Sequence, residues 1–323
     1  MKKPKVIVIG GGSGLSVLLK GLKHFPVDIT AIVSVADSGG SSGILKREFN
    51  IPAPGDLRNV MVALSDVEPL IEEVFQHRFK EDSSIGGHPL GNLLITAMYE
   101  ITGDIGKAME KLRKLFNIKS KILPATLEKI ELIAEKENGR IRMGESNIPV
   151  IGEKIKRVYY EGEVKTPKEN LEEIKKADMI IFGIGSLYTS IIPNLLCKDM
   201  QNALKNSKAK KIYICNAMEQ PGETEGYTVS DHVISINNHV GYNMIDKVIF
   251  DSREIPYEIL KRYHAEGSDV VKLDRKNLEY MGIEICEANL IRVDKNKQIR
   301  HNPYKLGAVI YSQIDNLDDF YNN

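Results

Sequence analysis

Residues 6–15 read VIVIGGGSGL: four β-branched residues lead into a glycine-rich turn, and apolar side chains at helical spacing follow from Ser16 to Lys23. A buried strand that ends in glycines and opens a helix directs backbone N–H groups and a helix dipole to one point, where an anion can bind. The glycines allow close approach, and a serine adds a hydroxyl donor. We therefore expect an anion to bind Gly11, Gly12, Ser13 and Gly14. Four glycines in five residues disfavour the alternative, a tight turn without a ligand.

Two common nucleotide-binding patterns are incomplete in this segment. Counted from Gly10, the dinucleotide fingerprint G-x-G-x-x-G needs its third glycine where Leu15 stands. The pattern G-x-x-x-x-G-K-[ST] does not occur in the sequence. The sequence therefore disfavours hydrolysis of ATP or GTP by a loop of the Walker type.

The alternation of strand and helix continues along the chain. Buried strands are expected at 29–35, 179–183, 211–215 and 247–250. Strands separated by helices imply right-handed crossovers and a mostly parallel sheet with helices on both faces. Residues from about 130 to 160 depart from this pattern, and the Asn-Gly pair at 138–139 predicts a hairpin within a small antiparallel β insertion. Because no repeat or low-complexity linker occurs, the sequence predicts one α/β domain over residues 1–323.

Composition excludes several classes of protein. The chain has 323 residues, and its 44 Lys and Arg balance 44 Asp and Glu, which disfavours a polybasic nucleic-acid binder. It has neither a signal-peptide pattern nor an apolar run of roughly eighteen residues, so we expect a cytoplasmic protein that does not enter a membrane. Cys197, Cys215 and Cys286 match no zinc spacing, and we expect buried thiols in a reducing compartment.

A second donor-rich loop follows the second expected strand. Asp37 ends that strand, near the place where dinucleotide-binding proteins carry a ribose-binding acid. Several N–H and O–H donors follow from Ser38, Gly39, Gly40, Ser41 and Ser42. Carboxyl ends of neighbouring strands meet at one edge of an open sheet, so two such loops indicate a diphosphate or a nucleotide. The alternative is a loop that is only flexible.

The third segment runs from Pro54 to Val60. Asp56 is expected at a helix N-cap, which puts Arg58 in the first turn, where the helix dipole disfavours a cation. This placement indicates that Arg58, beside Asn59, serves a ligand anion. A structural ion pair of Arg58 with Asp56 or Glu48 is the alternative.

Two later segments add candidates of the same kind. In GGHPLGN, residues 86–92, His88 suits a loop cap and a ligand contact equally well, and Asn92 lies at the start of an apolar helix. GIGSLYTS, residues 183–190, repeats the order of strand, glycine turn and hydroxyl-rich helix start. Its candidates are Gly185, Ser186, Tyr188 and, one turn further, Asn194. A polar turn at 299–303 precedes a final helix.

Several catalytic and metal-binding signatures are missing from the sequence. It contains no H-E-x-x-H and no known Cys–His signature. His232 and His239 would share a helix face, but no carboxylate pattern completes a metal site. We therefore assign no catalytic residue and no metal ligand.

Taken together, the motifs at 10–15, 35–43, 54–60, 185–190 and 220–224 resemble, in their order, the bacterial gluconeogenesis factor family of the CofD-like superfamily of 2-phospho-L-lactate transferases. The resemblance implies a three-layer Rossmann-like fold that binds a UDP-sugar such as UDP-GlcNAc or UDP-glucose. It also implies a role in cell shape and cell-wall balance during growth on gluconeogenic carbon. By the same resemblance, Tyr263 and Arg300 match positions associated with nucleotide-sugar binding, and Ser13 matches a hydroxyl position of the glycine loop.

Two features separate this chain from the transferase branch that it resembles. Where that branch carries further acids in the second and third loops, Ser38 and Arg58 stand here. Mg²⁺ bridging a diphosphate usually takes one or two carboxylates, and an arginine would put a positive charge at the metal position. The leading hypothesis is therefore a regulatory factor that binds a UDP-sugar without a cofactor, with Arg58 neutralising the diphosphate.

Two enzyme hypotheses remain as alternatives. One is a Mg²⁺-dependent transferase that uses a nucleotide diphosphate donor, with Asp37 and Asp56 holding the metal. The other, an NAD-dependent oxidoreductase, is disfavoured by the missing third glycine. A homodimer is expected only from the general frequency of twofold oligomers, and the sequence identifies no protein partner.

Overall fold

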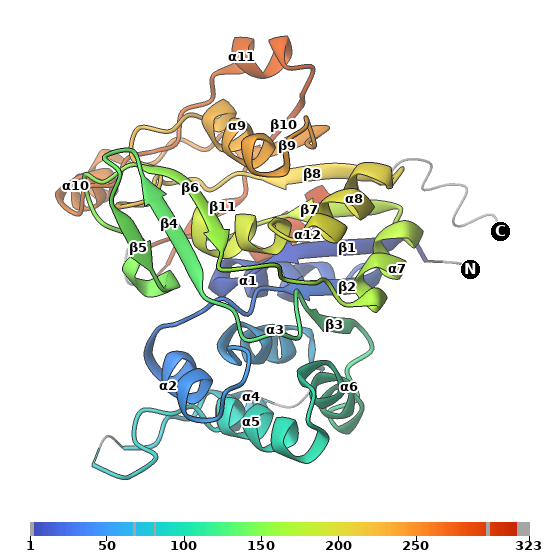
Figure 1. Ribbon diagram of the computed structural model, residues 1–323. Coiled ribbons are helices and arrows are strands. Elements are labelled where there is room, and N and C mark those ends of the chain that lie inside the picture. Colours follow the sequence, from blue (N-terminus) through green and yellow to red (C-terminus); the bar gives the residue numbers. More distant parts are fainter. Residues whose placement is uncertain (1–2, 67–68, 81, 295–297, 315–323) are drawn as a thin grey trace.

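The computed structural model describes residues 3–66, 69–80, 82–294 and 298–314. Its main sheet has seven strands: β1 (Lys5–Gly10), β2 (Asp28–Val33), β3 (Lys121–Pro124), β7 (Met179–Phe182), β8 (Lys210–Ile214), β9 (Lys247–Asp251) and β10 (Glu284–Ala288). They lie in the order β10-β9-β8-β7-β1-β2-β3, and every neighbouring pair is parallel (Figure 1). The expected strands are confirmed, although β2 ends at Val33 rather than Val35 and so leaves Asp37 well inside the following loop.

Burial on both faces explains why these strands lack alternating polarity. Val6, Val8 and Ile9 of β1 are wholly buried, and β1 pairs with β2 on one side and β7 on the other. A central parallel strand of this kind has no solvent face, so its sequence is a continuous apolar run.

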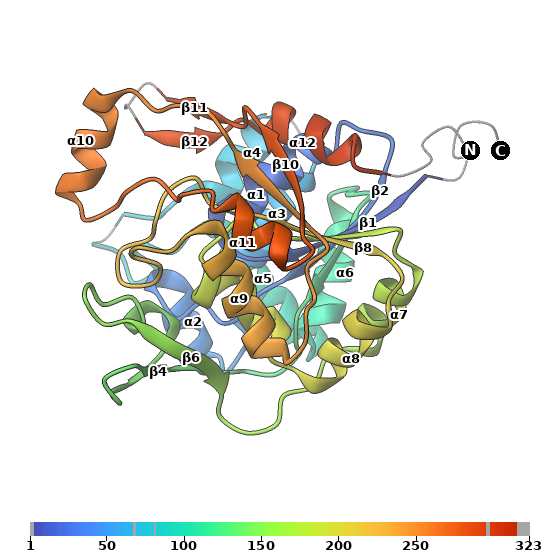
Figure 2. The same ribbon diagram turned by 90° about the horizontal axis from the view of Figure 1, so that it is seen from above.

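Helices cover both faces of the sheet. Figure 2 shows α1 (Gly12–Leu22), α3 (Gly55–Leu64) and α12 (Pro303–Tyr311) on one face, and α7 (Lys168–Lys176), α8 (Lys198–Asn206) and α9 (Val229–Val240) on the other. This arrangement is the expected three-layer Rossmann-like fold. The other helices are α2 (Gly40–Glu48), α4 (Pro69–Gln76), α5 (Leu90–Thr102), α6 (Ile105–Leu115), α10 (Tyr257–Ala265) and α11 (Arg275–Tyr280).

The β insertion expected near 130–160 is confirmed as a three-stranded antiparallel sheet. Its strands are β4 (Leu132–Lys136), β5 (Ile141–Met143) and β6 (Ile155–Tyr160), in the order β5-β4-β6. Leu132 and Val158 pack into the main core, so the inner face of this small sheet is continuous with it. In Figure 1 the small sheet stands beyond the carboxyl ends of the central strands, and it contributes a wall of the candidate site.

Residues 299–303 differ from the expected polar turn. Ile299–His301 forms strand β12, which pairs antiparallel with β11 (Ile291–Val293). Ile299 is buried in a small apolar cluster with Ala217 and Ile291, which explains why this segment is extended. The final helix, α12, begins directly afterwards, and the Asn302 side chain caps it by accepting the Tyr304 and Lys305 N–H groups.

The three cysteines are free thiols. Cys197 and Cys215 are buried as expected, and burial raises the pKa of Cys197 to about 11 and that of Cys215 to about 12. Cys286 is only half-buried because it lies on the edge strand β10, which corrects that part of the expectation. At neutral pH the two buried thiols stay protonated and unreactive.

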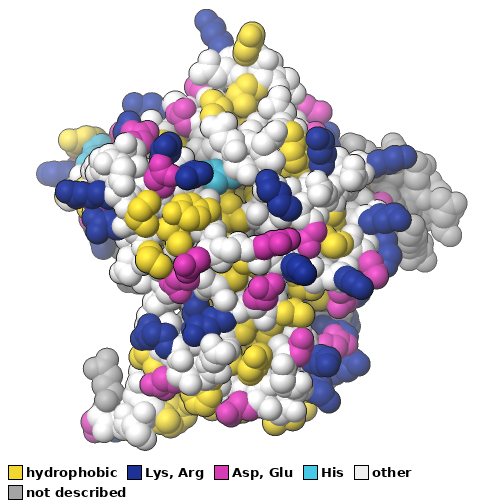
Figure 3. Space-filling model, viewed as in Figure 1, with side chains coloured by type: hydrophobic (Ala, Val, Ile, Leu, Met, Phe, Trp, Pro, Cys, Tyr) yellow, Lys and Arg dark blue, Asp and Glu magenta, His cyan; other side chains and the backbone are white. Residues whose placement is uncertain are grey.

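The described residues contain no helix that is long and apolar enough to cross a membrane. On the face drawn in Figure 3, basic and acidic side chains are interspersed, as expected for a chain with equal numbers of each.

Candidate functional site

The candidate site lies where the chain reverses its direction of travel across the sheet. From β1 the chain proceeds to β2 and β3, and it later returns to β7 on the opposite side of β1. The loops after β1 and β7 therefore diverge, and they leave a crevice at the carboxyl ends of the strands. In open α/β sheets this is the usual position of a ligand.

The glycine loop after β1 is closely packed. A Cβ on Gly14 would lie 2.7 Å from the Ile184 carbonyl oxygen, and one on Gly11 would lie 2.6 Å from Asp56 Oδ2. Gly12 has φ +68°, a conformation that favours glycine. The N-cap of α1, Gly11, provides no side-chain cap. The Gly12 N–H donates to the Asp56 carboxylate, so the N–H groups of Ser13 and Gly14 are the ones left for another acceptor. The loop needs its glycines for packing, and it still presents free donors.

A cavity of about 670 Å³ opens in front of this loop. Its volume is in the range of sites that enclose a small molecule or cofactor. Of the expected site residues, those that line it are Gly12, Ser13, Gly14, Gly185, Ser186, Tyr263 and Arg300. The structure thus brings together residues from the loops after β1 and β7, from α10 and from β12.

Carboxylates stand at the base of this cavity and beside it. Glu145 and Glu223 line it, and burial raises the pKa of each to about 7, with the charges of Asp37 and Asp56 adding to the effect on Glu145. Burial also raises the pKa of Asp56 to about 6, although the Gly12 N–H donates to its carboxylate. Asp37 further raises the pKa of Asp56, so these two acids lie near each other. Ordinary carboxylates would be fully ionised at pH 7, whereas these three are protonated in part.

Known proteins share the sequence of this region. A family model described as 2-phospho-L-lactate transferase CofD matches residues 6–291. The chain belongs to the CofD family. The match covers the seven strands of the main sheet, apart from the first residue of β1, and most of the residues that line the cavity; Ile299, Arg300 and His301 lie beyond it.

Within the CofD family the chain is similar to proteins named gluconeogenesis factor. The one from Bacillus subtilis (strain 168) is 49% identical over 310 residues, which cover 96% of this chain and 98% of that protein. The one from Listeria monocytogenes is 41% identical over 315 residues, with 97% of each chain covered. A crystal structure of a Bacillus halodurans protein superposes with a TM-score of 0.92 at 47% identity, over 96% of this chain and 100% of that chain. The resemblance seen in the five motifs is confirmed.

Tyr263 and Arg300 reach this CofD-family cavity from elements far along the chain. Tyr263 lies near the end of α10, where its ring packs on the small apolar cluster and its hydroxyl oxygen accepts the Ile299 N–H at 2.8 Å. Arg300 follows in β12, and its Nη2 donates to Gln298 Oε1 at 2.5 Å. The tyrosine therefore anchors the strand that carries the arginine to the cavity rim.

Tyr188 and Asn194 lie behind the cavity. The segment after Ser186 is not the expected hydroxyl-rich α-helix but a π-turn, Leu187–Ile191, followed by a 3₁₀ turn, Ile192–Leu195. The Tyr188 hydroxyl is hydrogen-bonded to Tyr227 and Ser235, and burial raises the pKa of Tyr188. Asn194 Nδ2 donates to the Gly10 and Ser190 carbonyls, so this side chain ties the glycine loop to its neighbour. Both residues support the site from within the core.

The remaining expected residues gather on the other side of Asp37 and Asp56. Asp56 does not cap α3. Pro54 is the N-cap, and Asp56 is the second helical residue. Its carboxylate accepts the Gly12 N–H instead. None of Asp37, Asp56, Arg58 or the 38–42 loop is in the lining of the large cavity. A second group of contacts holds Ser41, His88 and Asn92 together, and the Arg58 stem packs beside it. Ser38 instead bonds to Ser146 in the β insertion.

Sequence reasoning missed Glu145, Glu223, Asn216, Gln220 and His301. Asn216 Nδ2 donates to the Gly185 carbonyl, and Gln220 Nε2 donates to Ser186 Oγ at 2.7 Å. A signal existed for Gln220 and Glu223, which belong to one of the five motifs. No local signal existed for Glu145, which reaches the site from a short turn of the β insertion.

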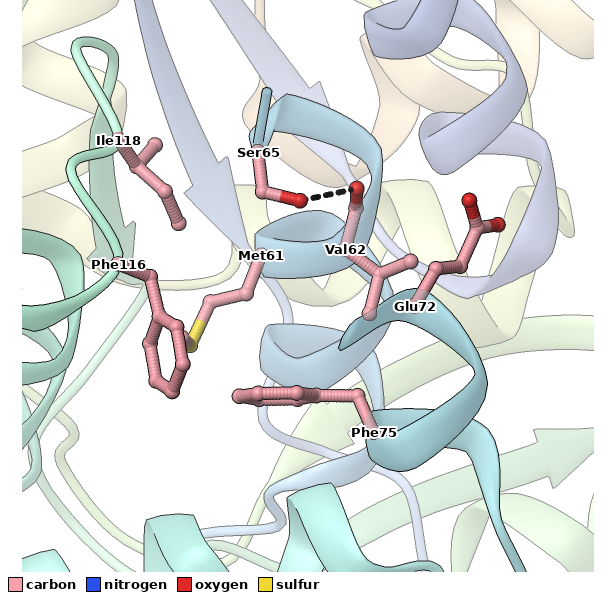
Figure 4. Close-up of a pocket in the computed structure, with 7 residues that line it drawn as sticks. All are labelled: Met61, Val62, Ser65, Glu72, Phe75, Phe116 and Ile118. Atoms are coloured by element: carbon pink, nitrogen blue, oxygen red, sulfur yellow. Dashed lines mark hydrogen bonds between the residues drawn. The ribbon is translucent and has the colours of Figure 1, made fainter. Parts of the chain in front are cut away.

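The described residues hold no metal cluster and one small apolar cavity apart from the site. Among the described residues, no cluster of three or more His, Cys, Asp or Glu has the arrangement of a metal site. Figure 4 shows a second cavity, between α3, α4 and the segment after α6, where Met61 and Phe116 face Phe75. Its volume of about 10 Å³ holds at most one water molecule, so it is a packing defect rather than a ligand site.

Proposed function

We propose that this chain is a cytoplasmic regulatory factor that binds a UDP-sugar of the UDP-GlcNAc or UDP-glucose type. The observation that supports this most directly is the 670 Å³ cavity at the sheet's crevice, with uncapped helix N–H groups at one end and Arg300 at its rim. The diphosphate would lie against Gly12, Ser13 and Gly14, as anions do at helix N-termini. The nucleoside would extend toward Tyr263 and Arg300.

The relatives' name supports the physiological half of the proposal. Proteins named gluconeogenesis factor match nearly the whole chain. We propose that ligand binding here serves cell shape and cell-wall balance during growth on gluconeogenic carbon, since UDP-sugars link central carbon flow to wall synthesis. Complementation of a Bacillus subtilis strain that lacks its gluconeogenesis factor tests this: the wild-type gene should restore growth on a gluconeogenic carbon source, and Arg300→Ala should not.

Titration calorimetry with UDP-GlcNAc tests binding in vitro. Arg300→Ala is expected to weaken affinity by about 1.5–3 kcal/mol, the typical contribution of a hydrogen bond to a charged group. Arg292→Ala is the matched control, because Arg292 is the cross-strand partner of Arg300 and is not in the cavity lining. Equal affinities for the two variants would remove Arg300 from the site, and no heat with any UDP-sugar would refute the proposal.

A second function, Mg²⁺-dependent transfer from a nucleotide diphosphate donor, has one observation in its favour. Asp37 and Asp56 are close enough for the charge of one to raise the pKa of the other. Two carboxylates fit a Mg²⁺ ion that also takes diphosphate oxygens, and the metal would offset the charge of the transferred group. These acids would hold the ion, and Asp56 would keep its bond to the Gly12 N–H.

Dependence on Mg²⁺ separates the two functions. The regulatory proposal expects UDP-GlcNAc binding that is unchanged by Mg²⁺ and no turnover. Turnover of a nucleotide diphosphate donor with Mg²⁺, abolished by Asp37→Asn, would favour the transferase instead.

A further inference from the structure

Arg58 is a buried cation without a counter-charge in contact. Its side chain is only 7% exposed. Its Nη2 donates to Asn59 Oδ1 at 2.8 Å, while Nε is buried and has no hydrogen-bond partner within the described part of the chain. The ion pairs found among the described residues include none to Arg58, so the expected alternative of a structural pair with Asp56 or Glu48 is wrong. Burying an unpaired charge costs several kcal/mol, and a protein keeps such a group only where something compensates it.

A second arginine approaches the first. Burial lowers the pKa of Arg58, and the next largest cause is the positive charge of Arg78, while the charges of Asp56 and Asp37 act in the opposite direction. Arg78 Nη1 donates to the Gly87 carbonyl at 2.7 Å, which fixes the second guanidinium at the start of the segment leading into α5. Two guanidinium groups therefore act on each other here, beside the two acids.

Three helix N-termini converge on the same place. A Cβ on Gly91, in the first turn of α5, would lie 2.8 Å from Arg58 Cγ, so the arginine stem packs against this helix. The start of α3, at Gly55, packs against Ser42 in the first turn of α2. The N-caps of α2, α3 and α5 all lack a side-chain cap. Uncapped N–H groups from three helices add to the positive potential around the guanidinium.

Three polar side chains beside the Arg58 stem are hydrogen-bonded to one another. Ser41 Oγ is hydrogen-bonded to His88 Nδ1 at 2.8 Å, and Asn92 Nδ2 donates to the same oxygen at 3.1 Å. His88 and Asn92 are 8% and 1% exposed, which is unusual for polar groups that serve no purpose. A buried guanidinium with an unpartnered Nε, close to hydroxyl, imidazole and amide groups and to three uncapped helix starts, has the chemistry of a tetrahedral oxyanion site.

We propose that Ser41, Arg58, Arg78, His88 and Asn92 form a subsite for the phosphate group of a small phosphate monoester, which binds as a second ligand beside the nucleotide. The subsite lies across Asp37 and Asp56 from the large cavity. The proposal of a second ligand rests on the proposed function, in which the large cavity binds a UDP-sugar. A phosphate fits better than a carboxylate because donors come from several directions, whereas a planar carboxylate uses one face of a single guanidinium. The protein would thus respond to two metabolites, one carrying a diphosphate and one carrying a single phosphate.

Calorimetry with inorganic phosphate, at constant ionic strength and without nucleotide, tests the subsite. We expect saturable binding to the wild-type chain and to the control Arg292→Gln, at least tenfold weaker binding to Arg58→Gln, and weaker binding to Ser41→Ala. Ser41→Ala keeps every charge, so it remains informative if Arg58→Gln fails to fold. Phosphate binding that does not saturate, or that is equal in all four proteins, would overturn the proposal.

Repeating the phosphate titration with saturating UDP-GlcNAc distinguishes a second ligand from the nucleotide's own phosphates. A separate subsite predicts that phosphate binds with an affinity within threefold of that measured alone. Competition would mean that Arg58 holds the diphosphate of the UDP-sugar, and the second-ligand proposal would be wrong. If UDP-GlcNAc does not bind at all, the proposed function fails, while the phosphate titration in its absence still decides the subsite.

Discussion

Replacing Glu223 with glutamine should change how the stability of the protein depends on pH. Glu223 is 5% exposed; Tyr188 N–H donates to its Oε2, and Thr189 Oγ1 donates to its Oε1. Burial raises its pKa to about 7 from the ordinary value of 4.5, so between these pH values the folded protein holds a proton that the unfolded chain releases. The free energy of unfolding therefore falls as pH rises from about 4.5 to 7, and it is then level. At 1.36 kcal/mol for each pKa unit, the fall amounts to about 3 kcal/mol.

Urea denaturation at pH 5 and pH 8, without nucleotide, measures this effect, since urea does not screen charges as guanidinium salts do. The glutamine side chain matches the protonated acid: its oxygen accepts the Tyr188 N–H, and its amide donates to Thr189. Glu223→Gln should therefore lose less stability than the wild type between the two pH values. Glu172→Gln is the control, because Glu172 is 68% exposed and its partner Lys176 is 4.0 Å away. Parallel pH profiles for wild type and Glu223→Gln would refute the reasoning.

Three other predictions follow from the site. Affinity for UDP-GlcNAc should fall as the pH rises from 6 to 8, because a bound anion favours the neutral forms of Glu145 and Glu223. The fall should reach up to tenfold per pH unit for each proton taken up on binding. Calorimetry in two buffers of different ionisation enthalpy should detect these protons, and an affinity that does not change with pH contradicts the prediction. Gly14→Ala should lower the free energy of unfolding by about 1–3 kcal/mol, because the added Cβ would lie 2.7 Å from the Ile184 carbonyl oxygen. Urea denaturation measures this change, and an unchanged free energy of unfolding would contradict it. Tyr188→Phe should cost about 1–2 kcal/mol of stability and leave the Kd for UDP-GlcNAc within twofold, because the hydroxyl bonds lie behind the cavity; a tenfold loss of affinity would place Tyr188 in contact with ligand.

The main sheet could be predicted because its strands are buried on both faces. Continuous apolar runs such as Val6–Ile9 and Met179–Phe182 have no other stable location in a soluble α/β protein, and glycine turns mark where each ends. The hairpin between β4 and β5 could be predicted because the turn signal of Asn138-Gly139 is local: residues 137–140 connect the two strands, and Gly139 has φ +81°.

Helix periodicity predicted that two histidines share one helix, but it did not predict what their rings bond to. His232 and His239 do share helix α9, and each Nδ1 bonds to the carbonyl one turn earlier, that of Thr228 or Ser235. Burial lowers the pKa of both rings, which keeps them neutral within the core. The two histidines seven residues apart are therefore structural core residues of the helix.

The composition of the candidate site could be predicted only in part, since it is assembled by tertiary contacts. Motifs at strand ends are local, so Gly12, Ser13 and Ser186 were found from the sequence. Glu145 comes from the β insertion, and nothing near it in sequence indicates that it meets Asp37 and Asp56. Counting carboxylates along the motifs alone therefore underestimates how acidic the folded site is.

That acidity bears on whether an anion can bind without a metal. An ordinary carboxyl with a pKa of 4.5 costs about 3.4 kcal/mol to protonate at pH 7, so two of them beside a diphosphate would need a cation. Glu145 and Glu223, with a pKa of about 7, are about half protonated already, and Asp56, at about 6, needs only about 1.4 kcal/mol. Protons can thus neutralise these acids at small cost when a nucleotide enters. The same burial that raises these pKa values makes Mg²⁺ compete with protons, so raising the pH should strengthen any metal-dependent binding while it weakens binding of the nucleotide alone. Opposite pH slopes with and without Mg²⁺ would show that both modes exist in one site, and two slopes of the same sign would contradict this electrostatic account.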